Sequence, residues 1–305
     1  MSFSSETKKE LCKVQNESIE EDFAECYGLL LFCKTFSPKN ILFHTESHAV
    51  AGRFCQLISS SFGSIVEQTS ALTGRHGGGR SFTITVPLQS DCERIFKHFG
   101  YIGNEVSHRI NRAITENENC TASFLRGVFL SCGSVNNPER DYHLEFTVPY
   151  KNLCNDLVKT ISDVEQLTYE LKIVERKGIY VAYLKDSEQI SDFLAFINAP
   201  LASMNIIETK IIKGIRNDAN RKANSEVANI KKTVAAAMEQ ISAIEKIRDT
   251  VGLDSLNSEL KELAELRLEN PDLSLRSLGE MLTPPISRSG VNHRMKKLLE
   301  LGKSK

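Results

Sequence analysis

The sequence lacks several features that would place it in common protein classes. No apolar run approaches the roughly 20 residues that cross a bilayer, so we expect no membrane-spanning helix. The first residues, MSFSSETKKELCKV, have no apolar stretch after their lysines, and we do not expect a secretory signal. The eight cysteines contain no Cys-x-x-Cys pair, which argues against a zinc ribbon and against thioredoxin-type redox chemistry. We expect a cytoplasmic protein with free cysteines, no bound metal and no cofactor.

Positive charge is concentrated near one end of the chain. The 305 residues carry a net charge of −1, with 21 basic and 26 acidic groups in residues 1–210 and 17 against 13 in residues 211–305. Residues 283–305 hold six basic groups and one acidic group. A localised basic surface is typical of proteins that bind phosphate groups of nucleic acids. A solvated charged tail is the alternative interpretation.

Three short helices are predicted in the last fifty residues. Apolar residues recur at helical spacing in each of them, and prolines interrupt the chain between them. Ser274 and Ser287 precede the second and third helices as N-caps. The predicted ranges are Ser258–Asn270, Leu275–Leu282, and Arg288 to about Leu301, where Gly302 should end the third helix. A short helix, a tight turn and a basic second helix form a helix-turn-helix.

The third of these helices is predicted to read DNA. Its apolar residues, such as Val291 and Met295, are spaced to face the other two helices. In the major groove, Arg and Lys pair with guanine and Asn with adenine, while Gly290 and the helix N-terminus favour a close phosphate. We therefore predict contacts to double-stranded DNA from Ser274, Ser287, Arg288, Ser289, Asn292, His293, Arg294, Lys296 and Lys297. A three-helix bundle with a charged outer surface is the alternative.

A longer helix is predicted upstream, over residues 218–247. Val227, Ile230, Val234 and Met238 recur there at spacings of three and four. The basic residues of this stretch are candidates for phosphate contacts, which raise affinity without reading sequence: Arg221, Lys222, Lys231 and Lys232. An ordinary amphipathic core helix is the alternative. Residues 201–218 are expected to be the passage between two domains.

The first two hundred residues contain a weak internal repeat. The segments Gly28–Lys34 and Gly127–Gly133 align at an offset of 99, each in an apolar helix that an extended segment follows. Strands are predicted at Ile41–Thr45, Ser64–Leu72, Ser81–Val86, Tyr142–Val148, Tyr169–Val174 and Ile179–Leu184, with a helix near 187–198. An α/β unit used twice is the simplest explanation. We therefore predict an α+β protein: a duplicated αββαββ domain (1–200), a linker (201–218) and an all-α helix-turn-helix domain (219–305).

The segment Phe124–Val135 resembles the signature helix of LAGLIDADG homing endonucleases. In that family two signature helices pack side by side, and each places one acidic residue where a divalent metal is held for phosphodiester cleavage. Cys33 and Cys132 stand at those two positions here, and a thiol does not replace an oxygen ligand of a hard cation. The resemblance implies the fold without the chemistry, so we expect no enzymatic activity. A working or metal-repurposed nuclease is the alternative.

A glycine-rich, basic segment spans residues 73–80. A phosphate-binding loop would lead into a helix, whereas a strand follows here, so we predict a hairpin tip. In the endonuclease-like architecture such hairpins lie on the surface that grips DNA. Arg75, His76 and Arg80 are therefore further candidates for backbone contacts.

A degenerate endonuclease-like domain followed by a helix-turn-helix is similar to the WhiA family of bacterial regulators. Long stretches carry the resemblance, at residues 221–233, 259–282 and 284–298. It implies transcriptional control connected with cell division, chromosome segregation and, in spore-formers, sporulation. It also implies a nucleoid-associated location. The N-terminal domain would add DNA contacts or bind other transcription proteins, and a protein-interaction scaffold anchored on DNA is a further alternative.

Overall fold

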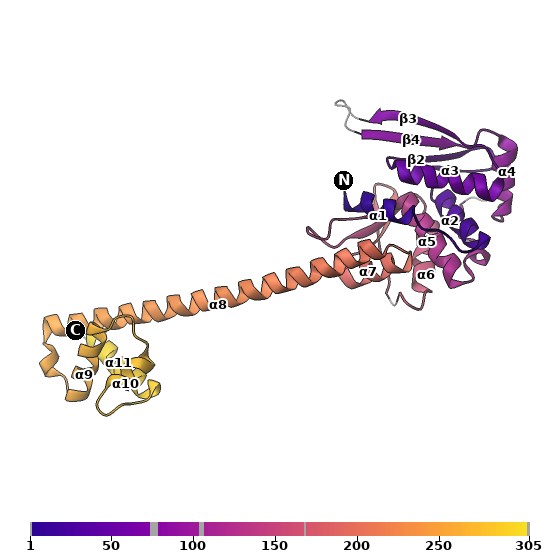
Figure 1. Ribbon diagram of the computed structural model, residues 1–305. Helices are drawn as coiled ribbons and strands as arrows, with labels where there is room; N and C mark the ends of the chain where they lie inside the picture. The colour runs from indigo at the N-terminus through magenta and orange to yellow at the C-terminus, as the bar shows by residue number, and fades with distance from the viewer. Residues whose placement is uncertain (1, 74–78, 104–106, 168, 304–305) are drawn as a thin grey trace. The chain divides into compact units, whose positions relative to one another are not determined.

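The computed structural model describes residues 2–73, 79–103, 107–167 and 169–303 (Figure 1). The chain forms two compact units, residues 1–213 and 214–305, each with its own apolar core. The boundary between them lies inside helix α8 (Pro200–Thr250). Residues 201–218, predicted as the passage between domains, are therefore helical throughout.

The first unit contains two similar halves. After α1 (Phe3–Leu11), the first half begins with α2 (Ile19–Leu31) and the second with α5 (Glu118–Cys132). The first half continues with β1 (Thr35–Phe36), β2 (Ile41–Thr45), α3 (His48–Phe62), β3 (Glu67–Thr73), β4 (Gly79–Thr85) and α4 (Gln89–His98). The second, preceded by η1 (Arg112–Thr115), continues with β5 (Gly133–Val135), β6 (Leu144–Val148), α6 (Lys151–Ser162), β7 (Lys172–Arg176), β8 (Ile179–Leu184) and α7 (Ser187–Phe196). The duplicated αββαββ order is confirmed, with one more helix after each half.

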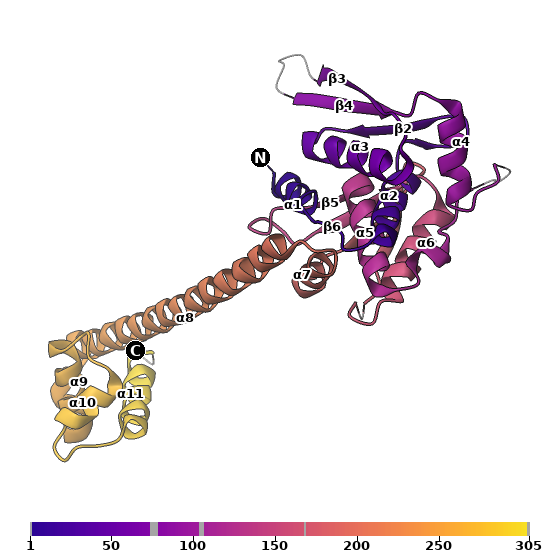
Figure 2. The same ribbon diagram turned by 45° about the vertical axis from the view of Figure 1, so that its right-hand side comes forward.

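Each half builds a four-stranded antiparallel sheet. The strand orders are equivalent, β1-β2-β4-β3 in the first sheet and β5-β6-β8-β7 in the second. Alternate residues point to opposite faces of a strand. In β6, for example, Leu144, Phe146 and Val148 are buried while Thr147 is exposed. Helices cover the apolar face of each sheet, and α2 and α5 lie side by side at the centre of the unit (Figure 2).

The two central helices approach so closely that only glycine fits at their crossing. A Cβ atom on Gly28 would lie 2.2 Å from the carbonyl oxygen of Phe124, and one on Gly127 would lie 2.1 Å from that of Glu25. Because real Cβ atoms do not approach an oxygen this closely, any side chain would force the backbones apart. Around this contact the two halves share a single apolar core.

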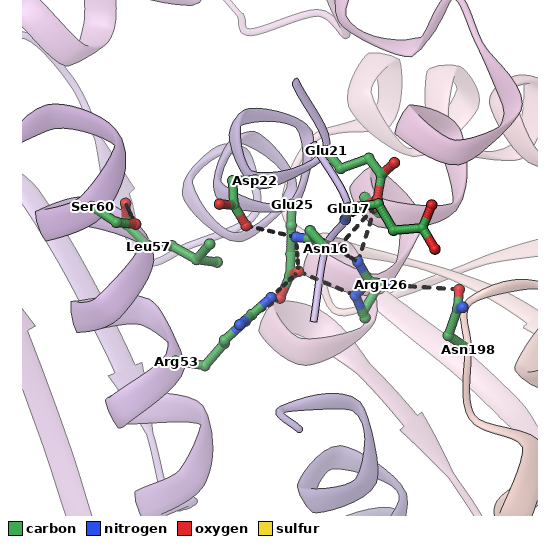
Figure 3. A network of polar contacts seen from close by, with 11 residues as sticks. Asn16, Glu17, Glu21, Asp22, Glu25, Arg53, Leu57, Ser60, Arg126 and Asn198 are labelled. Carbon is green, nitrogen blue, oxygen red and sulfur yellow. Dashed lines mark hydrogen bonds and ion pairs between the residues drawn. The ribbon is translucent and has the colours of Figure 1, made fainter. Parts of the chain in front are cut away.

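A buried ionic network surrounds the same crossing (Figure 3). Glu25 of α2 is 0% exposed, and it accepts hydrogen bonds from Arg53 of α3 (4% exposed) at 2.8 and 2.6 Å. Arg126 of α5, 1% exposed, donates to the same carboxylate at 3.2 Å. The other donors of Arg126 reach Asn16 before α2, Ser123 on α5 and Asn198 before α8. The network therefore joins elements that are far apart in the sequence.

The second unit is helical and agrees with most of the predicted boundaries. After the end of α8 it contains η2 (Leu253–Ser255), α9 (Ser258–Glu269), α10 (Leu275–Met281) and α11 (Arg288–Lys303). Its core combines Ile244 and Ile247 of α8 with apolar residues of α9, α10 and α11. One boundary was predicted wrongly, because α11 continues through Gly302 to Lys303. Gly302 is buried, and an added Cβ would lie 2.9 Å from that of Ala243, so this glycine serves packing against α8 and does not end the helix.

We expect Gly127→Ala to destabilise the protein by about 1–3 kcal/mol or more, because its methyl group would overlap the α2 backbone. Gly52→Ala in α3 is the matched control, since nothing lies within 4 Å of the added Cβ. That control should stabilise the protein by about 0.5–1 kcal/mol through helix propensity. Urea unfolding followed by circular dichroism measures both. Equal stability of Gly127→Ala and the natural chain would contradict the close crossing.

Candidate nucleic-acid interface

The helix-turn-helix is formed by α10, the turn after it and α11. The Ser274 hydroxyl accepts a hydrogen bond from the Ser277 amide at 3.2 Å, and the Ser287 hydroxyl accepts one from the Gly290 amide at 3.3 Å. Both predicted N-caps are therefore confirmed. Gly279 lets the turn approach α10, because an added Cβ would lie 2.4 Å from the Ile286 carbonyl oxygen. This contact fixes the position of the turn that leads into α11.

One side of α11 holds the helix in place. Val291, Met295 and Leu298 are buried in the core of the second unit, as their spacing predicts. Gly290 is half-buried, and an added Cβ would lie 3.3 Å from the side chain of Ile286. The apolar side of α11 therefore faces α9 and α10, which leaves its polar side outward.

The outward side carries most of the predicted DNA-binding set. The exposed members are Ser287, Arg288, Ser289, Asn292, His293, Lys296 and Lys297, together with Ser274 at the start of α10. Arg294 differs from them, because it is half-buried and forms an ion pair with Glu259 of α9 at 3.0 Å. In the part of the chain that the structure describes, Arg288, Lys296 and Lys297 form no ion pair. They are therefore available to phosphate or base groups.

The sequence analysis did not identify Arg267 of α9, a buried arginine that holds the turn between α9 and α10 in place. Its guanidinium is buried and donates to the carbonyl oxygens of Asn270, Pro271 and Leu273 at 3.4, 3.3 and 2.8 Å. Burial lowers its pKa. The guanidinium thus satisfies the carbonyl groups of the turn between α9 and α10. In the sequence an arginine among acidic residues resembles an ordinary surface charge, so no local signal identified it.

The remaining cations predicted to contact phosphate lie on other elements. Arg221, Lys222, Lys231 and Lys232 are all exposed on α8. Arg80 is exposed on β4, whereas Arg75 and His76 lie outside the described residues.

The two signature positions hold half-buried thiols. Cys33 follows α2, and its Sγ donates to the carbonyl oxygen of Thr35 at 3.0 Å; Cys132 is the last residue of α5. Burial raises the pKa of each thiol to about 12. At neutral pH both are therefore uncharged, which makes them neither thiolate nucleophiles nor ligands for a hard cation.

Lys8 lies beside Cys132, one of the two positions that carry metal-binding acids in LAGLIDADG endonucleases. The Lys8 ammonium of α1 donates to the carbonyl oxygen of Leu130 at 3.1 Å, in the last turn of α5 and next to Cys132. Burial lowers the pKa of Lys8. Glu145, a nearby carboxylate, pairs with His143 at 3.0 Å. Within the described ranges no group of three or more His, Cys, Asp or Glu residues could hold a metal ion. The residues present do not fit a divalent metal at this site.

Together these features define a two-part protein: a LAGLIDADG-like domain without the metal-binding acids, and a helix-turn-helix domain. Residues 121–216 match the WhiA LAGLIDADG-like domain, and residues 219–302 match the WhiA C-terminal HTH domain. The chain belongs to the WhiA family.

Similar proteins span almost the whole chain. The probable cell division protein WhiA of Thermoanaerobacter sp. (strain X514) is 39% identical, over 99% of this chain and 98% of that protein. That of Alkaliphilus oremlandii (strain OhILAs) is 38% identical, over 99% and 97%. The crystal structure of full-length WhiA from Thermotoga maritima aligns with a TM-score of 0.60 and 25% identity, covering 100% of this chain and 99% of that one. Among the described residues, no helix is both long and apolar enough to cross a membrane.

We expect magnesium or manganese to leave the thermal unfolding midpoint of the full chain unchanged. A metal that binds only the native state raises that midpoint by mass action, and the thiols and the Lys8 ammonium offer it no oxygen ligands. The triple variant Lys8→Ala, Cys33→Asp, Cys132→Asp is the control that restores carboxylates and removes the cation. A metal-dependent rise in the midpoint of the natural chain would show that the site had been misjudged.

Proposed function

We propose that this protein is a transcriptional regulator that binds duplex DNA through α11 and does not cleave it. The observation that carries the proposal is the division of α11 into a buried apolar side and an exposed polar side, on which Arg288, Lys296 and Lys297 form no ion pair with any residue that the structure describes. A helix of this diameter enters the major groove, where side chains read the base edges.

The spacing of the exposed residues supports direct reading of bases near the start of α11. Arg288, Asn292 and Lys296 are four residues apart and so lie along one side of the helix. Arg288 has the donor geometry for O6 and N7 of guanine, and Asn292 that for N6 and N7 of adenine. Lys296 and Lys297, further along the helix, are proposed to contact phosphates, as are the exposed cations Arg221, Lys222 and Lys232 of α8.

The biological role is proposed from the family. Relatives with over a third of their residues identical are named probable cell division proteins, which supports a role in cell division. A role in chromosome segregation, and in sporulation in spore-formers, is proposed from the family resemblance alone. The LAGLIDADG-like domain, with thiols at the metal-binding positions, is proposed to add DNA contacts or to bind other transcription proteins. This work would take place in the cytoplasm, on the nucleoid.

We expect Arg288→Ala or Asn292→Ala to reduce discrimination between preferred and random DNA by about 1–3 kcal/mol, the contribution of one good bidentate base contact. The measurement is a binding titration of the full chain on genomic fragments and on random duplex, with and without magnesium. Arg248→Ala, at an exposed arginine paired with Asp249, is the control and should leave the preference intact. Full preference in both α11 variants would show that α11 is not the reading helix.

We expect Lys296→Ala or Lys297→Ala to act differently, because a phosphate contact carries no sequence information. Each should weaken binding to all duplexes alike and reduce the slope of log affinity against log salt by about one. An unchanged slope in both variants would exclude them as phosphate contacts.

A further inference from the structure

An unpartnered apolar stripe runs along α8 within the second unit. Every residue from 214 to 236 is exposed, yet Val227, Ile230, Val234 and Met238 are apolar and remain 50, 63, 50 and 67% exposed. A single helix in water gains most of its stability by burying such a stripe, and soluble proteins rarely leave one open. The stripe therefore requires a partner.

The spacing of the stripe follows a heptad repeat. Asn220, Val227, Val234 and Ile241 fall at position a, and Ala223, Ile230 and Ala237 at position d. β-Branched residues at a, combined with Leu at d, favour two-stranded parallel coiled coils, and a single asparagine at a specifies register and oligomeric state. Here the a positions follow that pattern, whereas the d positions hold Ala223, Ile230 and Ala237. The next d residue, Ile244, is already buried in the helix-turn-helix core, so the repeat ends where the folded unit begins.

The charges beside the stripe indicate which partner fits. Glu226 is at position g and Lys231 is five residues later at position e, and neither has an ion pair in the part of the chain that the structure describes. In a parallel pair of identical helices, each g residue lies beside the following e residue of the other copy. Two Glu226–Lys231 pairs would then form. An antiparallel pair would instead place e beside e, which brings the two Lys231 residues together.

We propose that residues 220–241 of α8 pair with the same residues of a second copy as a parallel two-stranded coiled coil. An apolar groove of about 710 Å³ lies at the C-terminal end of this segment, between Val234, Met238 and Ile241 of α8 and residues 271–273. This groove has room for the partner's Met238 beside the contact formed by positions a and d. The outer positions b, c and f hold Arg221, Lys222 and Lys232, which stay exposed.

This pairing would give the protein a two-fold axis along α8. The two copies of α11 would be related by that axis, and such symmetric pairs bind two half-sites in inverted orientation. The inference goes beyond the proposed reading of bases by α11 and does not depend on it. A chain that binds DNA as a monomer would overturn the pairing and leave the reading helix standing.

The first test is sedimentation equilibrium of the full chain. The natural protein should form a dimer, and Ile230→Asp should weaken dimerisation by at least about tenfold, because it buries a charge in the seam. Ala236→Asp is the matched control: it adds the same charge at position c and should remain dimeric. Circular dichroism verifies that both variants keep their helices. A natural protein that stays monomeric up to its solubility limit, or equal dimerisation of the two variants, would overturn the proposal.

The second test fixes the orientation of the helices. Glu226→Lys and Lys231→Glu should each weaken the dimer, and the double exchange should restore it. Under oxidation Val234→Cys should form a disulfide with itself across the axis, whereas Ala236→Cys should not; peptide mapping separates this product from the eight natural cysteines. A double exchange as weak as the single variants, or no crosslink at residue 234, would exclude the parallel pair.

Discussion

The crossing of α2 and α5 is the contact on which the first unit depends. The absence of side chains at Gly28 and Gly127 lets the two backbones touch, and this proximity brings the Glu25 carboxylate within reach of Arg126. A buried carboxylate without partners would cost several kcal/mol, so Arg53 and Arg126 must both be in place when the helices dock. The sheets that follow each helix then lie on either side of this pair (Figure 3 shows the network at its centre).

The residues at this crossing are required by the fold, whereas the residues at the ends of the two helices are required only by nuclease chemistry. The glycines are needed wherever the two helices meet, whether or not the site is used, because no other residue fits between the backbones. The acids at the ends of the helices have no such packing role. Here they are thiols, and the Lys8 ammonium lies beside the end of α5. Two neutral thiols, with the Lys8 side chain beside the end of α5, offer a cation neither negative charge nor oxygen ligands.

In the second unit, packing again decides which side of each helix is buried and which side remains exposed. The apolar side of α11 is buried against α9 and α10, and Arg267 satisfies the carbonyl groups of the turn between those two helices. The polar side of α11 therefore faces solvent in a fixed orientation. Within the second unit, residues 214–236 of α8 are exposed, and the helix is buried against the other helices of that unit only from Gln240 onward. A polar side that faces outward offers a surface for DNA, and an apolar side that faces outward requires another apolar surface.

The sequence by itself determined the features that depend on residues close together in the chain. The caps Ser274 and Ser287, the six longer strands of the two sheets, the offset of 99 between the halves and the thiols at 33 and 132 follow from local spacing and residue type. The short strands β1 and β5 were not predicted. Only the tertiary structure decided the roles that depend on a distant partner. Gly302 packs against Ala243 and does not end α11, Arg294 pairs with Glu259, and Lys8 lies against Leu130. The physical reason is that a buried contact is defined by two surfaces, and a local pattern describes only one of them.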